Sequence, residues 1–71
     1  MVKPTKVTND IRRLRAEAGE MTQTELARRV GVTRQTLIAI EHGRYSPSLE
    51  VAFLIARALG VRLDDVFSYP E

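Results

Sequence analysis

Cysteine is absent from the 71 residues, and only one histidine is present. The chain can therefore form no disulfide, no thiolate metal site and no cysteine nucleophile, and one imidazole is too few for a conventional metal centre. A glycine-rich phosphate loop and a plausible pair of catalytic acids are also missing. These absences argue against an enzyme, and we expect neither a metal nor a cofactor.

Long apolar runs are missing as well. None reaches the ~18 residues that a membrane span needs, and the N-terminus lacks the apolar segment of a signal peptide. We therefore expect a cytoplasmic protein without a membrane-bound part. The length predicts one domain with one modest core, and no effector domain for a small molecule is evident.

The charge is small in total but unevenly distributed. The net charge is +2, whereas residues 1–34 hold eight Lys/Arg against four Asp/Glu and residues 35–71 hold three against five. A basic first half could orient the domain on a polyanion such as DNA. Random scatter of surface charge would give the same counts, so charge alone leaves both interpretations open.

Capping residues and apolar spacing predict helices throughout the chain and no strand. The first helix is expected from an N-cap at Asn9 to a stop at Gly19. The second is expected over residues 22–30, where Thr22 and Glu25 have the spacing of a capping box.

A third helix is predicted at residues 33–42, with Thr33 as its cap. Only Gly31 and Val32 separate it from the second helix, and so short a connection entered through glycine forces a sharp corner. That arrangement is typical of a helix-turn-helix.

The remaining apolar residues predict two more helices. The fourth, capped by Ser48, is expected to be the central core helix because its apolar stripe is wide: Leu49, Ala52, Phe53, Ile55, Ala56 and Leu59. A short fifth helix is suggested by Leu63, Val66 and Phe67. We thus expect a compact all-α, five-helix domain over residues 9–67, between a flexible arm (1–8) and a fraying tail (68–71).

The third helix has one face suited to reading DNA. Leu37 and Ile40 point inward, so the opposite face carries Arg34, Gln35, Ile38 and Ala39. Arginine can donate two hydrogen bonds to guanine, glutamine can pair with adenine, and the apolar side chains can pack on thymine methyl groups. The same residues could instead be ordinary solvated surface, and Ile38 could meet a neighbouring subunit.

Several motifs recur at the spacing of a known family. Thr22-Gln-Thr-Glu-Leu-Ala27, Gly31-Val-Thr-Arg-Gln-Thr-Leu37, Ile40-Glu-His-Gly43 and Ile55-Ala-Arg-Ala-Leu-Gly-Val61 resemble the Cro/repressor-type helix-turn-helix of the xenobiotic-response-element family. The likeness extends over about residues 9–67. It implies a repressor-like fold whose third helix enters the major groove of double-stranded DNA.

The resemblance also implies roles for single residues. The side chains expected to hold backbone phosphates are Gln23, Thr33, Thr36, Arg44 and Tyr45. Those expected at base edges are Arg34, Gln35, Ile38 and Ala39. Arg15 and Glu41 match a family pair that ties the first helix to the end of the third.

Two positions depart from the family pattern. Glu20 is an extra residue in the loop before the second helix, which could shift how the first helix sits. Arg62 stands where the family often has a Ser or Thr cap, which makes the fifth helix harder to predict.

The function expected from these features is sequence-specific regulation of transcription, most simply as a repressor. Because one domain of this size makes few contacts, we expect a homodimer on a two-fold operator. Apolar residues near the C-terminus are expected to form the dimer interface: Val61, Leu63, Val66, Phe67 and Tyr69. The alternative is an adaptor or antitoxin-like module whose main partner is a protein.

Overall fold

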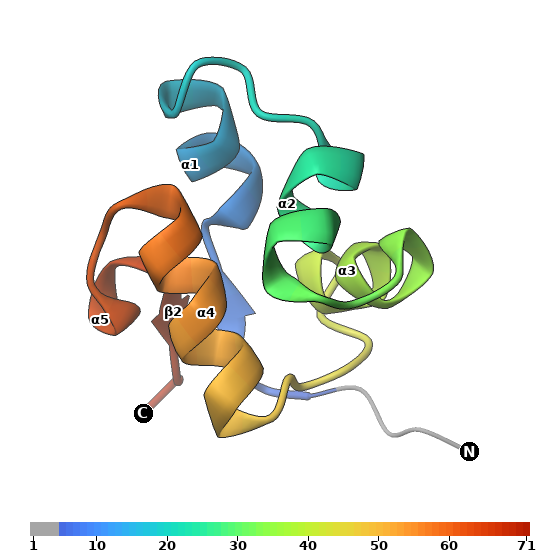
Figure 1. Cartoon of the computed structure of the whole chain (residues 1–71). Helices are drawn as coiled ribbons and strands as arrows, with labels where there is room; N and C mark the ends of the chain where they lie inside the picture. Colours follow the sequence, from blue (N-terminus) through green and yellow to red (C-terminus); the bar gives the residue numbers. More distant parts are fainter. Residues whose placement is uncertain (1–4) are drawn as a thin grey trace.

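The computed structural model describes residues 5–71 and contains the five expected helices (Figure 1). The helices are α1 (Ile11–Glu17), α2 (Gln23–Val30), α3 (Arg34–Glu41), α4 (Leu49–Leu59) and α5 (Leu63–Val66). The all-α fold class is therefore confirmed. The expectation of no strand is wrong, because β1 (Thr8–Asn9) pairs antiparallel with β2 (Phe67–Ser68).

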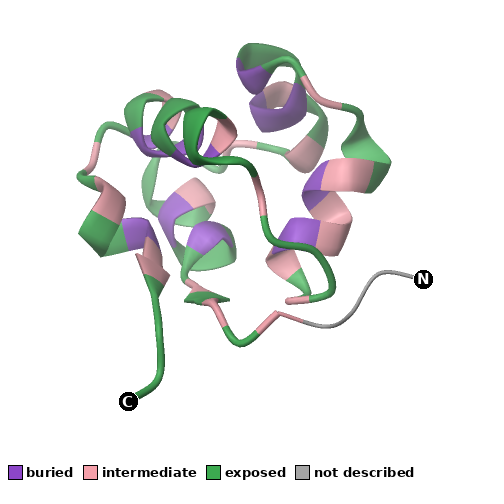
Figure 2. Ribbon diagram, turned by 90° about the horizontal axis from the view of Figure 1, so that it is seen from below, coloured by how far each residue is buried: buried purple, intermediate pink, exposed green. Residues whose placement is uncertain are grey.

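The core lies where all five helices meet. Each helix turns its buried residues inward (Figure 2), and α2 packs on both α3 and α4. The largest fully buried side chains come from every helix: Ile11, Leu26, Leu37, Ile40, Ile55 and Val66. Since α3 gives only Leu37 and Ile40 to this core, its other face remains at the surface.

The apolar stripe of α4 is narrower than the sequence indicated. Ala52, Ile55, Ala56 and Leu59 form its buried face, whereas Leu49 is 69% exposed and Phe53 is 49% exposed. The spacing of apolar residues identifies the apolar face of a helix. The packing of neighbouring helices then decides which residues of that face are buried.

The turn between α2 and α3 is held by local hydrogen bonds. Thr22 caps α2, because its hydroxyl accepts from the Glu25 N–H at 3.0 Å. Gly31 ends α2 at φ 86°, a left-handed conformation in which a side chain would be strained. Val32 then packs against the core and Thr33 caps α3, so the corner of the helix-turn-helix is fixed from both sides.

Only half of the expected capping box is formed. The Glu25 carboxylate does not reach back to Thr22 but pairs with Arg28 and with Arg29, the latter at 2.7 Å. These hydrogen bonds, first from Arg29 and then from Arg28, lower the pKa of Glu25. Both arginines are thereby directed along the outer face of α2.

The expected N-terminal arm is partly built into the fold. Its residues 1–4 lie outside the described residues, but the Thr5 N–H donates to the Gly43 carbonyl at 3.2 Å and Thr8 pairs with Ser68 in the sheet. This pairing also takes Ser68 out of the expected tail.

Asn9 does not cap α1; that position belongs to Asp10. The Asn9 side chain instead joins the start of α1 to the end of α3. Its oxygen accepts from the Ile11 N–H at 3.1 Å, and its nitrogen donates to the Ile40 carbonyl at 3.0 Å. Local spacing could not reveal this role, because Ile40 is distant in sequence.

The two departures from the family pattern leave the fold intact. Glu20 adopts φ 60° directly after Gly19, and the loop still closes because the Met21 N–H donates to the Arg15 carbonyl at 2.9 Å. At the start of α5, the Asp65 carboxylate accepts from the Arg62 N–H at 3.0 Å. Asp65 thus forms the half of a capping box in which the third helical residue accepts from the N-cap N–H.

One residue assigned to the dimer interface belongs to the core. Val66 is 2% exposed, so it has no surface to offer a partner. Val61 and Phe67 are half-buried and pack against the core, whereas Tyr69 is 68% exposed. The expectation was wrong for Val66 because α5 and β2 turn it toward the other helices.

Candidate nucleic-acid interface

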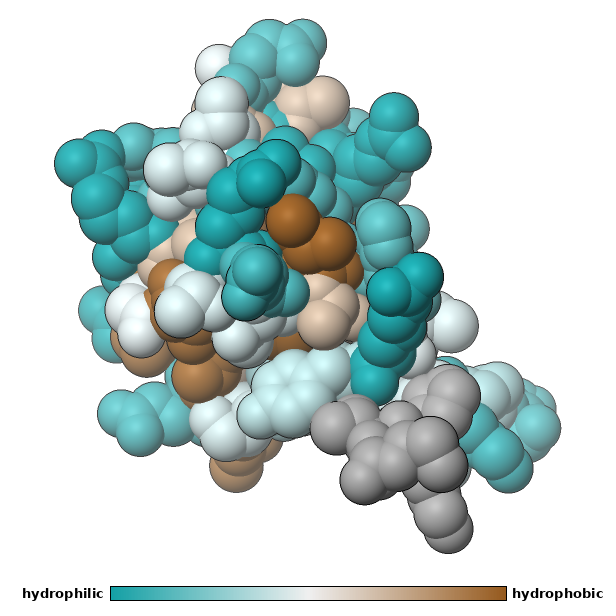
Figure 3. Space-filling model, turned by 90° about the vertical axis from the view of Figure 1, so that its right-hand side faces the viewer, coloured by the Kyte–Doolittle hydropathy of each residue, from teal (hydrophilic) through white to brown (hydrophobic). Residues whose placement is uncertain are grey.

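The outer face of α3 is the exposed side of the helix-turn-helix. Helix α3 lies on the opposite side of the molecule from α5 (Figure 1), and the view that faces it shows a mostly hydrophilic surface with a small apolar area (Figure 3). Arg34 and Gln35 are both exposed and occupy its first turn. Their side chains therefore lie at the end of α3 that a recognition helix presents to base edges.

Two hydroxyl groups stand beside this first turn. The Thr33 hydroxyl accepts from the Thr36 N–H at 3.1 Å and donates to the Thr36 hydroxyl oxygen at 2.9 Å. A threonine hydroxyl has one proton, so the proton of Thr36 remains able to donate. The pair can thus cap α3 and still offer a donor to an anion.

A hollow of about 590 Å³, the polar hollow, lies between α1, the start of α2 and the length of α3 from Arg34 to His42. It brings together four of the residues that the sequence singled out: Arg15, Gln23, Arg34 and Glu41. Its walls are Arg12, Arg15, Thr22, Gln23, Thr24, Arg34, Glu41 and His42. Three arginines against one glutamate give this hollow an excess of positive charge.

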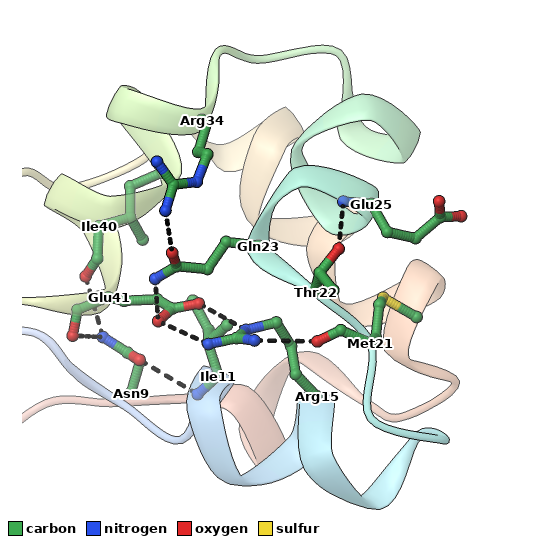
Figure 4. A network of polar contacts seen from close by, with 10 residues as sticks. All are labelled: Asn9, Ile11, Arg15, Met21, Thr22, Gln23, Glu25, Arg34, Ile40 and Glu41. Carbon is green, nitrogen blue, oxygen red and sulfur yellow. Dashed lines mark hydrogen bonds and ion pairs between the residues drawn. The ribbon is translucent and has the colours of Figure 1, made fainter.

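A chain of polar contacts crosses the floor of the polar hollow (Figure 4). Arg15 binds Glu41 through two hydrogen bonds, at 2.8 and 3.1 Å, and also donates to the Met21 carbonyl at 2.9 Å. The side chains of Arg15 and Glu41 are only 14% and 5% exposed. The ion pair implied by the family resemblance is therefore present, and it joins α1 to the end of α3.

Gln23 links this ion pair to the first turn of α3. Its amide nitrogen donates to Glu41 at 3.2 Å, and its oxygen accepts from Arg34 at 3.4 Å. Because a glutamine amide carries two N–H groups, one donor remains for a further acceptor. Gln23 is thus oriented before any ligand arrives.

A second hollow, of about 420 Å³, lies on the other side of α3. It is mostly apolar, and we call it the apolar hollow. It collects six of the residues that the sequence singled out: Thr33, Gln35, Thr36, Ala39, Arg44 and Tyr45. The half-buried Ile38 borders neither of these two hollows.

The turn after α3 places Arg44 and Tyr45 beside that helix. The Arg44 N–H donates to the Ala39 carbonyl at 2.9 Å and the Gly43 N–H to the Ile40 carbonyl at 3.1 Å. Together with φ 73° at Gly43, these bonds form a Schellman motif, which glycine accommodates without strain. The chain therefore turns back along α3, and both side chains are exposed there.

Sequence reasoning gave no site role to three residues in the walls of the polar hollow: Arg12, Thr24 and His42. The signal for Arg12 was available, because Arg12 and Arg15 are three residues apart and so share a face of α1. Arg13 points elsewhere: its hydrogen bonds to Glu17 and Asp10 raise its pKa.

Other kinds of site find no support in the residues that the structure describes. Over residues 5–71, no group of three His, Asp or Glu side chains could hold a metal ion. In the same part of the chain, none of the helices has the length and apolar character needed to cross a bilayer.

Comparison with known proteins decides the family. A family model described as helix-turn-helix matches residues 11–66. The chain belongs to the helix-turn-helix family. The resemblance to regulators of the xenobiotic-response-element type is thereby confirmed, and the expectation that the chain is not an enzyme agrees with this membership.

Relatives of this helix-turn-helix protein are found in several organisms. It is 61% identical over 62 residues to an uncharacterised HTH-type transcriptional regulator of Methanothermobacter thermautotrophicus, which covers 86% of this chain and 88% of that protein. It is 36% identical over 64 residues to the cryptic phage CTXphi transcriptional repressor RstR of Vibrio cholerae, covering 90% of this chain and 57% of RstR.

A solved structure gives the same result for the fold. The clp gene regulator ClgR of Corynebacterium glutamicum superimposes with a TM-score of 0.72 at 34% identity, covering 78% of this chain and 57% of ClgR.

Proposed function

We propose that this helix-turn-helix protein is a transcriptional regulator that binds double-stranded DNA with α3 in the major groove. The observation that supports it best is the position of Arg34 and Gln35, which are exposed side by side on the first turn of the outer helix. Donors suited to phosphates lie on both sides of them, in the polar and apolar hollows. We propose that it acts in the cytoplasm.

The base readout follows from the chemistry of the exposed face. Arg34 donates to O6 and N7 of a guanine, and Gln35 pairs with N6 and N7 of an adenine. Ala39, in the wall of the apolar hollow, packs against a thymine methyl group. Ile38, half-buried beside it, adds apolar surface to the same contact.

The phosphate contacts flank this readout on both sides of α3. On one side, Gln23 donates its second amide proton. On the other side, Thr36, Arg44 and Tyr45 donate from the rim of the apolar hollow, with Thr33 beside them. Such contacts fix the register of the protein on the duplex and leave sequence discrimination to the base edges.

Salt dependence tests this proposal. Each neutralised phosphate releases counterions, so the logarithm of the binding constant should fall linearly with the logarithm of salt concentration, by ~0.9 per contact. Fluorescence anisotropy on a mixed-sequence duplex, repeated over a range of salt concentrations, measures this slope. Binding that does not change with salt would contradict the proposal, and the same titration with an uncharged peptide-nucleic-acid duplex is the control.

We further propose that two copies bind a two-fold operator, and the structure revises the surface expected between them. Val66 is removed, whereas Leu63, Phe67 and Tyr69 remain, with Val61 at the edge. Leu49 joins them because it borders a hollow of about 270 Å³ together with Leu63 and Phe67. Phe53 joins them because it is exposed one helical turn beyond Leu49 on the same face of α4. A two-fold contact needs one patch that supplies both a protruding group and a recess; Phe53 and this hollow meet that need.

Replacing Phe53 tests the dimer surface. In Phe53→Ser, we expect the second copy to bind a duplex with two half-sites at roughly tenfold higher protein concentration, since a central aromatic contributes more than 1 kcal/mol to such contacts. Sedimentation of the complexes gives the stoichiometry. Leu54→Ser is the matched control, because Leu54 is also exposed, at 37%, but lies on another face of α4. Equal behaviour of the two variants would rule out this surface.

The proposed regulatory outcome is repression. A protein that occupies an operator excludes other proteins from the same stretch of DNA. The similarity to RstR, whose name describes a transcriptional repressor, supports this choice.

A further inference from the structure

Arg12 has a position that the helix-turn-helix does not explain. It lies on α1, outside α2 and α3, yet it forms part of the wall of the polar hollow together with Gln23 and Arg34. It is exposed, and within residues 5–71 no carboxylate lies at ion-pair distance from it. Its charge is therefore available to a ligand in the hollow.

The neighbouring arginines are engaged differently. Arg15 binds Glu41 through two hydrogen bonds, so its charge is largely compensated. Arg13 binds Asp10 at 3.2 Å and Glu17 at 3.0 Å on the outer face of α1. Of the three arginines on α1, Arg12 is thus the one whose charge faces the hollow without a carboxylate partner.

We propose that Arg12 is a DNA-backbone contact, and that the polar hollow seats one phosphate between Arg12 and the second amide proton of Gln23. This inference rests on the proposed DNA-binding function and extends the interface to α1. A phosphate suits the hollow because it accepts hydrogen bonds from both sides and is drawn by the excess positive charge. Arg34, at the opposite wall, remains directed to a base.

The proposal distinguishes Arg12 from a residue that reads sequence. A phosphate contact contributes equally on every sequence, whereas a base contact discriminates among them. We therefore expect Arg12→Ala to reduce the salt slope by about one unit and to weaken binding to all duplexes alike. Arg12→Lys, which keeps the charge, should retain most of the slope.

Anisotropy titrations on the mixed-sequence duplex, with wild type, Arg12→Ala, Arg12→Lys and Arg13→Ala, carry out the test. Arg13→Ala is the matched control, because it removes the same side chain one position along α1, and we expect it to keep the wild-type slope. Thermal unfolding of each variant checks that the fold is retained. An Arg12→Ala slope equal to wild type, or an equal loss in Arg13→Ala, would overturn the proposal.

A second measurement identifies the phosphate itself. Neutral methylphosphonate is introduced at one backbone position at a time in the same duplex. We expect at least one position where the substitution weakens wild type but no longer affects Arg12→Ala; no such position would contradict the contact. If wild type shows no salt-dependent binding at all, the proposed function fails, which is a different result from an unchanged slope in Arg12→Ala.

Discussion

Replacing both Arg34 and Gln35 by alanine is expected to abolish sequence-specific binding while leaving the fold unchanged. Each well-formed bidentate contact to a base discriminates by ~1–3 kcal/mol, so the two together correspond to a loss of roughly thirtyfold or more. Binding to unrelated duplexes should change much less, because the phosphate contacts from Gln23, Thr36 and Arg44 remain.

The measurement compares a specific duplex with an unrelated duplex by anisotropy, at one salt concentration. Arg57→Ala is the control, because Arg57 is exposed on α4 and lies outside both hollows. An unchanged ratio of the two affinities in the double variant would show that the first turn of α3 does not read bases.

Removing Arg15 is expected to have the largest effect on stability. Arg15→Ala leaves the Glu41 carboxylate, whose side chain is 5% exposed, with Gln23 as its remaining partner among the contacts described above. An uncompensated buried charge costs ~3 kcal/mol or more, which for a domain of this size lowers Tm by roughly 12–24 °C. The contacts between α1, α2 and the end of α3 should loosen together.

Thermal unfolding followed by circular dichroism measures this effect. Arg13→Ala provides the comparison, since the ion pairs of Arg13 lie at the surface, where such pairs contribute little. If Arg15→Ala and Arg13→Ala unfold at the same temperature, the Arg15–Glu41 pair does not hold α1 against α3.

The parts of the fold that local chemistry controls could be predicted from the sequence. Thr22, Thr33 and Ser48 each cap the helix that follows by accepting a backbone N–H. Gly31 and Gly60 end the helices before them in the left-handed conformation. Because these interactions span only a few residues, the boundaries of α2, α3 and α4 and the sharp corner before α3 followed from residue types and spacing.

The parts that depend on distant contacts could not be predicted in the same way. The β1–β2 pair joins the two ends of the domain, and neither segment alternates apolar and polar residues over strand length. Leu49 and Phe53 have the spacing of core residues but remain exposed, whereas Val66 at the C-terminus is buried. Packing among the helices decides which of these apolar residues are buried. The spacing of residues within one helix does not show how its neighbours pack against it.

The candidate site shows the same division. The pairing of Arg15 with Glu41 and the exposed face of α3 followed from the family resemblance and helical periodicity. The grouping into two hollows did not, because it depends on how α1 and the turn after Gly43 lie against α3. Spacing could show that Arg12 shares a face of α1 with Arg15, but not that this face borders a hollow with Gln23 and Arg34.

Selection of bound duplexes from a random pool tests most directly whether the first turn of α3 reads DNA. The selection is carried out in parallel with wild type and with the Arg34→Ala, Gln35→Ala double variant, under the same salt conditions. We predict that wild type enriches a recurring motif containing guanine and adjacent adenine or thymine, repeated with two-fold symmetry, and that the variant enriches none. The same motif enriched by both proteins, or no motif enriched by wild type, would contradict this function for α3.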